Sequence, residues 1–265
     1  MQLFEFHDQP WFPARLRDYV TDALQSVLNL GGLYRGSASR LNRAFIASQA
    51  SRVVDLCSGG SGPWPWLHET LRGERGRLAE VCLTDLYPNA STIQRLQQSP
   101  AGTLTYWPES VDATGVPARL VGFRTIFSSF HHFPRREAVG ILQDAVDHHQ
   151  GIGVFEAARR HPVTIALTVF MFLGALVTAP FIRPFRFHRL FWTYLLPVIP
   201  FLLFWDGVMS CLRAYSSQQL REMIKSVDAE GYFWEVGEDR GGFAPVTYLV
   251  GYPIASSPVC VPTAD

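Results

Sequence analysis

Acidic and histidine side chains follow four apolar stretches that the sequence predicts as strands. Asp55, Asp85 and Glu156 each end one such stretch, and His131 and His132 come directly after another. The carboxyl ends of parallel strands meet at one edge of a sheet, where ligands collect. We therefore expect these side chains to gather around one cleft.

The first of these strand ends runs into a turn of small residues, Cys57-Ser-Gly-Gly-Ser-Gly62. Small residues let backbone N–H groups approach a bound ligand closely. A carboxylate after the second strand, such as Asp85, is placed to accept two hydrogen bonds from a ribose diol. The two features together favour a ribose-containing ligand at this edge of the sheet.

Three side chains are candidates for removing a proton from a substrate. His131 and His132 follow the fourth strand, and histidine titrates near neutral pH. Asp206 borders a long apolar run, and a carboxyl group buried there would have a raised pKa that suits proton transfer. The structural alternatives are a histidine pair that packs against or caps the next helix, and a salt-bridged helix end at Asp206.

Strands alternate with helices through the middle of the chain, which predicts an α/β fold with a doubly wound, mostly parallel sheet. The expected parallel strands are Arg52–Leu56, Ala79–Asp85, Thr103–Trp107, Arg124–Ser129 and Gly151–Glu156. The expected helices are Pro13–Leu30, Ser39–Ser48, Trp64–Leu71, Ser91–Gln98, Pro117–Leu120, Arg135–His148 and Ser216–Val227, the last with Ser216 as N-cap. The segments Tyr232–Val236 and Thr247–Tyr252 are expected to close the sheet as an antiparallel pair.

The order of these features resembles that of the class I S-adenosylmethionine-dependent methyltransferases, over most of residues 52–156 and the two closing strands. The resemblance implies S-adenosylmethionine as the cofactor, with its methionine part at the glycine turn, its ribose at Asp85 and its adenine at Asp112. It also implies a methyl-transfer cleft lined by residues 129–132. The turn departs from the family's G-x-G-x-G pattern, because Cys57 and Ser61 replace two glycines. The expected cofactor-binding residues are Asp55, Cys57, Ser58, Gly59, Gly60, Asp85, Leu86, Asp112, Ala113 and Ser129.

Methyl transfer from a sulfonium needs mainly a positioned acceptor and, for some acceptors, a base. Arg213 and Tyr215 follow Asp206 where this family often builds its substrate pocket. Trp11 and Arg17 belong to an N-terminal segment that resembles the helical cap over the cofactor cleft. The expected substrate contacts are therefore Trp11, Arg17, Arg213 and Tyr215.

The stretch from Ile165 to Trp205 contains no acidic residue. The uncharged run Val163–Ile182 is long enough to cross a bilayer, whereas Leu190–Trp205 contains Pro197 and Pro200, which should kink it. A full crossing would place Arg183, Arg186 and Arg189 on the far side, against the positive-inside tendency. The pattern favours a hairpin that dips into one leaflet, with these arginines at phosphate headgroups and Phe181, Phe185, Phe187 and Trp192 at the interface. A two-helix span and a lid or dimer interface on a soluble protein are the alternatives.

Position along the chain suggests what this segment does. It lies between the fifth strand and the following helix, beside the acceptor side of the cleft, so we expect a hydrophobic or lipid-like acceptor. A methyltransferase on a soluble metabolite with the hairpin as an anchor, and a non-catalytic cofactor-binding scaffold in a membrane complex, remain open.

The amino-acid composition indicates the number of domains, the kinds of partner and the cellular setting. The chain has 265 residues, is 48% hydrophobic and has a formal net charge of zero, which suits one main α/β domain and gives no reason to expect nucleic acid. Its four cysteines are scattered, so we expect no metal site and a reducing setting, with the catalytic domain on the cytoplasmic side of a membrane. The expected units are an N-terminal cap (1–50), a cofactor-binding core (51–158), a membrane-associating hairpin (159–205), the closing helix and strands (206–254) and a flexible tail (255–265). The sequence predicts no oligomeric state.

Overall fold

A seven-stranded sheet forms the centre of the chain in the computed structural model, which describes residues 4–30, 32–71, 76, 79–98, 103–240 and 244–254. The strand order is β3-β2-β1-β4-β5-β7-β6. The strands are β1 (Arg52–Leu56), β2 (Glu80–Leu83), β3 (Leu104–Tyr106), β4 (Phe123–Phe127), β5 (Ile152–Glu156), β6 (Tyr232–Asp239) and β7 (Val246–Pro253). Strands β1 to β5 pair in parallel, and β7 pairs antiparallel with both β5 and β6. The predicted doubly wound sheet with an antiparallel closing pair is confirmed, and the predicted tail lies outside the described residues.

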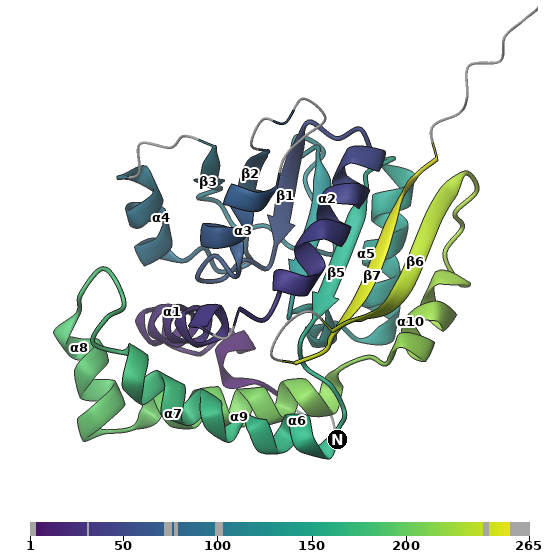
Figure 1. Cartoon of the computed structure of the whole chain (residues 1–265). Helices are drawn as coiled ribbons and strands as arrows, with labels where there is room; N and C mark the ends of the chain where they lie inside the picture. The colour runs from purple at the N-terminus through teal and green to yellow at the C-terminus, as the bar shows by residue number, and fades with distance from the viewer. Residues whose placement is uncertain are drawn as a thin grey trace, which may run out of the picture.

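Both faces of the sheet are covered by helices (Figure 1). Helices α5 (Arg135–Asp147) and α10 (Ser217–Ile224) pack on one face, and α2 (Ala38–Ala47) and α3 (Trp64–Thr70) pack on the other. Neighbouring residues of a strand point to opposite faces of the sheet. Val54 therefore packs in the core between the sheet and α5 with α10, and Val53 packs in the core between the sheet and α2 with α3. Burial on both faces explains why the strands read as continuous apolar runs.

In the described part of the chain, the remaining elements of the N-terminal and cofactor-binding regions are α1 (Ala14–Leu30), with 17 residues, and four shorter pieces. The shorter pieces are η1 (Phe6–Asp8), η2 (Arg35–Ser37), α4 (Ala90–Gln97) and η3 (Phe130–His132). The helix expected at residues 117–120 is wrong: these residues form a turn, in which the Leu120 N–H donates to the Pro117 carbonyl at 2.8 Å. Four residues allow a single turn, which is too short for cooperative helix formation. The N-cap expected at Ser216 is confirmed, with a full capping box between Ser216 and Gln219.

The apolar segment folds into α6 (Pro162–Leu167), α7 (Val169–Thr178), α8 (Phe187–Leu190), η4 (Phe191–Leu195) and α9 (Val198–Arg213). Figure 1 shows these elements gathered along one end of the molecule, below the sheet, together with α1. Helix α7 packs against both α1 and α9. Helix α9 also runs without a break across residue 205, where the predicted hairpin ends.

The apolar run Val163–Ile182, whose length would allow a bilayer crossing, is not one helix. It breaks between α6 and α7 and leaves the helix after Thr178. Within the described residues no helix is both long and apolar enough to cross a bilayer by itself; only the pair Phe187–Leu195 and Val198–Arg213, bent by 72°, reaches the required length and composition together. The kink predicted at Pro197 falls at this bend. Pro200 causes none, because it lies in the first turn of α9, where the helix does not need its N–H.

Arg189 is buried, contrary to the prediction that it lies at the membrane interface. Its guanidinium group donates to the carbonyl oxygens of Ile182 at 2.5 Å and Pro184 at 3.0 Å, and it lies 3.9 Å from the Asp22 carboxylate. The loop between α7 and α8 therefore folds around this side chain and is tied to α1. Arg183, by contrast, is exposed.

Candidate active site

A cavity of about 340 Å³ lies where the carboxyl ends of β1, β2 and β4 meet α1, α9 and the N-terminal residues. Nine of the ten residues predicted to hold the cofactor line it. They are Cys57, Ser58, Gly59, Gly60, Asp85, Leu86, Asp112, Ala113 and Ser129. The strand-end residues that the sequence places along the chain are thus brought together in space.

The glycine turn keeps a glycine-like backbone at its two substituted positions. Cys57 has φ +58° and Ser61 has φ +90°, in the left-handed region that side chains other than glycine rarely occupy. Ser61 accepts a hydrogen bond of 2.7 Å from the Gln25 amide. The loss of two glycines therefore leaves the shape of the turn intact.

Helix α1 lies directly over this turn because Gly60 has no side chain. A Cβ atom at Gly60 would lie 2.8 Å from the Thr21 carbonyl oxygen of α1. Asn29, farther along α1, donates to the Gly62 carbonyl at 3.2 Å. The turn and α1 thus form one wall of the cavity.

Asp85 is held in place by two backbone N–H groups, one from each side. The Gly59 N–H donates to one carboxylate oxygen and the Tyr87 N–H to the other, both at 2.8 Å. Burial raises the pKa of Asp85 above its ordinary value, although these two bonds act in the opposite direction. Each oxygen keeps a lone pair for a further donor, as a ribose diol would require.

Asp55 does not line the cavity but lies beneath its floor. Its two oxygens accept hydrogen bonds from the hydroxyl groups of Thr125 and Ser58, both at 2.6 Å. The Ser58 hydroxyl oxygen in turn accepts from the Thr84 N–H at 3.1 Å. Asp55 therefore joins β1, β4 and the glycine turn and positions them for a ligand.

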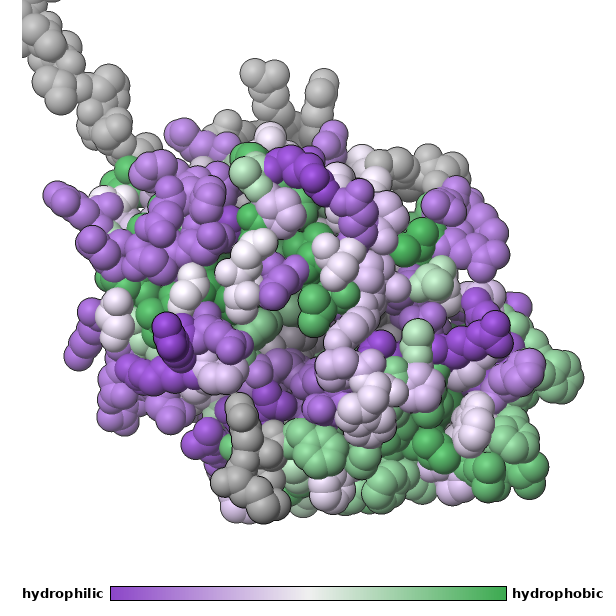
Figure 2. All heavy atoms as spheres, turned by 180° about the vertical axis from the view of Figure 1, so that it is seen from behind, coloured by the Kyte–Doolittle hydropathy of each residue, from purple (hydrophilic) through white to green (hydrophobic). Residues whose placement is uncertain are grey.

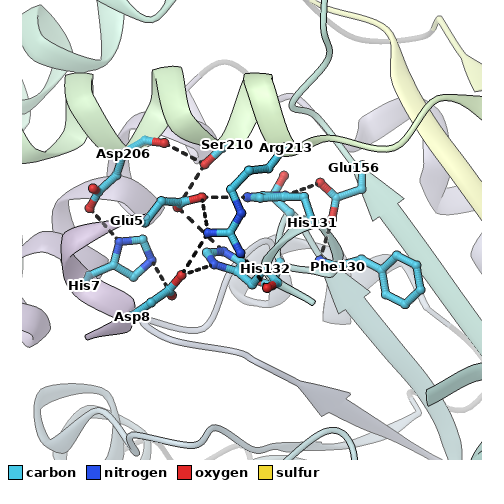
Figure 3. Close-up of polar contacts among 12 residues, drawn as sticks. Glu5, His7, Asp8, Phe130, His131, His132, Glu156, Asp206, Ser210 and Arg213 are labelled. Atoms are coloured by element: carbon cyan, nitrogen blue, oxygen red, sulfur yellow. Dashed lines mark hydrogen bonds and ion pairs between the residues drawn. The ribbon is translucent and has the colours of Figure 1, made fainter. Parts of the chain in front are cut away.

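A cluster of charged side chains forms the opposite end of the site (Figure 3). We call it the polar cluster; it consists of Glu5, His7, Asp8, His131, His132, Glu156, Asp206, Ser210 and Arg213. Its members come from the N-terminal residues, η3, the end of β5 and α9. Segments separated by about 120 to 200 positions in the sequence thus meet in one network.

Each histidine of the polar cluster is paired with a carboxylate through Nδ1. The distances are 2.7 Å from His131 to Glu156, 2.7 Å from His7 to Asp206 and 2.5 Å from His132 to Asp8. The second oxygen of Glu156 accepts from the Phe130 N–H at 2.7 Å, and that of Asp206 accepts from the Phe6 N–H at 2.9 Å. The imidazole rings are therefore held in fixed orientations.

Charge pairing also decides the protonation of the cluster. Burial alone would lower the pKa of His131, but the Glu156 and Glu5 carboxylates together outweigh it and raise the pKa to about 10. Burial would lower the pKa of His7 as well, yet the bond to Asp206 and nearby Asp8 raise it to about 9. Burial acts to raise the pKa of Glu5, and His132 and His131 bring it down to about 2.

Of the three predicted bases, His132 and Asp206 line the cavity and His131 does not. A base must reach the proton that it removes, so His132 and Asp206 are the two that meet this condition. Asp206 is 4% exposed and projects from α9, in agreement with the buried position that the sequence led us to consider.

The four predicted substrate contacts are placed differently from one another. Arg17 lines the cavity, and its N–H groups donate to the carbonyl oxygens of His7 at 2.8 Å and Gln9 at 2.7 Å. Trp11 is 66% exposed and does not line it. Arg213 and Tyr215 also do not line it; the first donates to the His132 carbonyl at 2.5 Å and the second to the Phe133 carbonyl at 2.7 Å.

Sequence reasoning missed Glu5 and His7 as site residues. Both lie in the cavity wall, and both belong to the short sequence Phe-Glu-Phe-His-Asp at residues 4–8. The sequence does contain a signal that could have pointed to a site: three ionisable residues stand among aromatic ones within five positions. Local spacing could not show that they meet residues from α9 and η3.

No protein-family model matches the sequence, and neither does any curated protein. Among solved structures the chain is similar to the plantazolicin methyltransferase BpumL in complex with SAH, with a TM-score of 0.55 and 8% identity over 91% of this chain and 96% of that one. It is similar to the methyltransferase domain of bacterial CtHen1 (TM-score 0.50, 10% identity, 83% and 99% of the two chains). It is also similar to human N-acetylserotonin methyltransferase in complex with SAM (TM-score 0.50, 12% identity, 87% and 55%). The fold is that of the class I S-adenosylmethionine-dependent methyltransferases.

Proposed function

We propose that this chain is an S-adenosylmethionine-dependent methyltransferase that acts at a membrane surface on a hydrophobic or lipid-like small molecule, with its core on the cytoplasmic side. The observation that carries the proposal is the meeting of the glycine turn and Asp85 at one cavity, in a fold shared with methyltransferases. The structures similar to this one include complexes with SAM and SAH, which supports the choice of cofactor.

The residues around the cavity fit this cofactor. The backbone of Gly59 and Gly60 would hold its methionine part, Asp85 its ribose, and Asp112 with Ala113 its adenine. A volume of about 340 Å³ falls within the roughly 300–1,000 Å³ of small-molecule sites. The cofactor supplies an activated methyl group, and the chain positions the acceptor.

Proton removal from an acceptor falls to His132 or Asp206, because both face the cavity. Asp206 is buried and holds the His7 ring through a bond of 2.7 Å. A fixed acid of this kind can orient an acceptor hydroxyl or amine and receive its proton.

The lipid-like acceptor is suggested by the two faces of α9. Leu203, Asp206 and Gly207 line the cavity, while Phe201 is 50% exposed and Phe204 is 36% exposed. One helix therefore separates the cavity from an apolar outer surface. An acceptor that entered from a bilayer would have to pass only this helix.

Figure 2 shows hydrophobic side chains gathered at the lower right, over the region of α7 to α9. Monomeric soluble proteins rarely expose large contiguous apolar patches. The exposed apolar residues of this segment are Val163, Val169, Phe170, Leu173, Val177, Phe181, Phe185, Phe187, Phe191, Tyr194, Leu195, Leu196, Phe201 and Phe204. We propose that this surface rests on the lipid.

Calorimetric titration with S-adenosylhomocysteine tests the cofactor site. The parent chain should bind it, and Asp85→Ala should weaken binding by about 1.5–3 kcal/mol, or roughly 10- to 150-fold. Glu109→Ala, which removes an exposed acid outside the cavity, serves as the control. No binding by the folded parent would remove the methyltransferase proposal.

Flotation with phosphatidylcholine–phosphatidylglycerol vesicles tests the membrane surface. The parent should float with the vesicles, and the double variant Phe185→Asp/Phe187→Asp should lose most of this binding. Phe233→Asp, which adds one negative charge at an exposed aromatic residue of β6, should not, whereas Phe187→Asp alone should already weaken the binding. If the parent does not float with the vesicles, the proposed membrane role is wrong. A separate incubation of membrane lipid extracts with labelled cofactor tests whether a lipid is the acceptor.

A further inference from the structure

We infer that Glu5, His131 and His132 form a binding site for one divalent transition-metal ion. The Nε2 atom of His131 lies 3.4 Å from one carboxylate oxygen of Glu5, and the Nε2 atom of His132 lies 3.8 Å from the other. One ligand atom from each of the three residues falls within 4.8 Å of the others. Figure 3 shows the three side chains converging from η3 and the N-terminal residues.

These separations suit a shared metal ion better than direct hydrogen bonds. An N–H···O hydrogen bond spans about 2.7–3.2 Å between heavy atoms. Ligands that each lie about 2.0–2.2 Å from a tetrahedral ion are roughly 3.3–3.6 Å from one another. The distances of 3.4 Å and 3.8 Å need adjustments of a few tenths of an ångström to meet that geometry.

The second independent observation is the state of the His131 ring. Its side chain is 1% exposed, and its Nε2 atom makes no hydrogen bond within the described residues, because the Glu5 oxygen that faces it lies 3.4 Å away. A buried polar atom left without a hydrogen bond costs about 1–3 kcal/mol. A metal ion at this atom would satisfy it.

The outer bonds of both rings match the pattern around metal-binding histidines. Nδ1 of His131 is bonded to Glu156 and Nδ1 of His132 to Asp8, so both rings aim Nε2 at Glu5. Metal-binding histidines ordinarily have their other ring nitrogen bonded to a carboxylate or carbonyl, which fixes the ring. Both His131 and His132 have this arrangement, with Glu156 and Asp8 as the carboxylate partners.

Charge in the polar cluster also favours a cation. Four carboxylates, those of Glu5, Asp8, Glu156 and Asp206, face one guanidinium group, that of Arg213, and three imidazole rings. A divalent ion can supply positive charge that protonated imidazoles would otherwise have to provide. Two imidazoles and one carboxylate are typical ligands of zinc, iron(II) and manganese rather than of magnesium or calcium, which prefer oxygen.

The site would be open on one side. Glu5 and His132 line the cavity, whereas the buried His131 does not. An ion with these three protein ligands would keep coordination positions toward the cavity, as catalytic metal sites do. If the proposed function holds, the acceptor's oxygen or nitrogen would be bound there.

Titration with Co²⁺ tests the site in the full chain after removal of metals with a chelator. We expect one Co²⁺ per chain, a visible absorption band, and displacement by Zn²⁺. Glu5→Gln and His132→Ala should each lower Co²⁺ affinity at least about 10-fold, and Asp8→Asn, which frees the His132 ring, by about 10- to 100-fold. His148→Ala, a change at the exposed histidine that follows α5, should leave it unchanged.

Circular dichroism and thermal unfolding identify variants that fail to fold. If Glu5→Gln or His132→Ala fails to fold, the Co²⁺ affinity of Asp8→Asn is used to test the site. A folded parent that binds no stoichiometric Co²⁺, or folded variants that bind it as tightly as the parent, would overturn the site. Binding of S-adenosylhomocysteine is measured separately, so loss of one proposal leaves the other standing.

Discussion

Asp55 makes the stability of the sheet depend on pH, because its carboxyl group is buried where β1, β4 and the glycine turn meet. Its side chain is 1% exposed. Burial outweighs the hydrogen bonds from Ser58 and Thr125 and raises the pKa to about 7, from an ordinary value of 3.8. The folded chain therefore holds a proton over a pH range in which the unfolded chain has released it.

The sign and size of the effect follow from this difference. The contribution of Asp55 to stability is fully present below about pH 4 and is lost as the pH rises through the folded-state pKa near 7. Within that window each pH unit lowers the free energy of unfolding by about 1.4 kcal/mol. Between pH 5 and pH 8 this one group should remove roughly 2–3 kcal/mol.

Urea unfolding at pH 5, 6, 7 and 8 measures this effect in the parent and in Asp55→Asn. All other titrating groups are common to both proteins, so the difference between their free energies of unfolding isolates Asp55. We expect the parent to lose about 2–3 kcal/mol relative to the variant across this range. Parallel profiles would refute the reasoning. Thr125→Val, which removes a donor to the ionised carboxylate, should move the loss to higher pH.

Three further changes test the packing of α1, α7 and α10. Gly60→Ala places a Cβ 2.8 Å from the Thr21 carbonyl and should cost about 1–3 kcal/mol in urea unfolding, with weaker ligand binding as α1 moves away. Gly174→Ala meets two methyl groups of Val27 at 2.9 Å, so it should lower the melting temperature, and Val27→Ala in the same chain should restore part of the loss. Ser216→Ala removes the capping box of α10 and should cost about 1 kcal/mol, whereas full retention of stability would show that the cap contributes nothing.

The sheet and the cofactor side of the cavity could be predicted because their signals are local. Asp55 lies near the end of one short apolar strand, Asp85 follows another, and the glycine turn is read from six consecutive residues. Once such strands pair in parallel, their carboxyl ends have to meet. The sequence therefore predicts which side chains gather there without any knowledge of distant contacts.

The acceptor side could not be predicted in the same way. Glu5 and Asp8 meet Arg213, more than 200 positions away, and no periodic pattern relates them. The internal packing of the apolar segment was hidden for a related reason: its length suggests one continuous helix, but the chain breaks after α6, and Gly174 allows α7 to pack on α1. Arg189 likewise reads as an interfacial charge, although the loop around it supplies carbonyl partners.

The pairing of the N-terminal residues with α9 has a consequence for the order in which the chain folds during synthesis. Glu5, His7 and Asp8 leave the ribosome about 200 residues before Asp206, Ser210 and Arg213. At about 5–20 residues per second this interval lasts roughly 10–40 s. Strands β1 to β5 can pair during that time, but the polar cluster cannot form. The cavity therefore closes late, after the apolar helices have emerged.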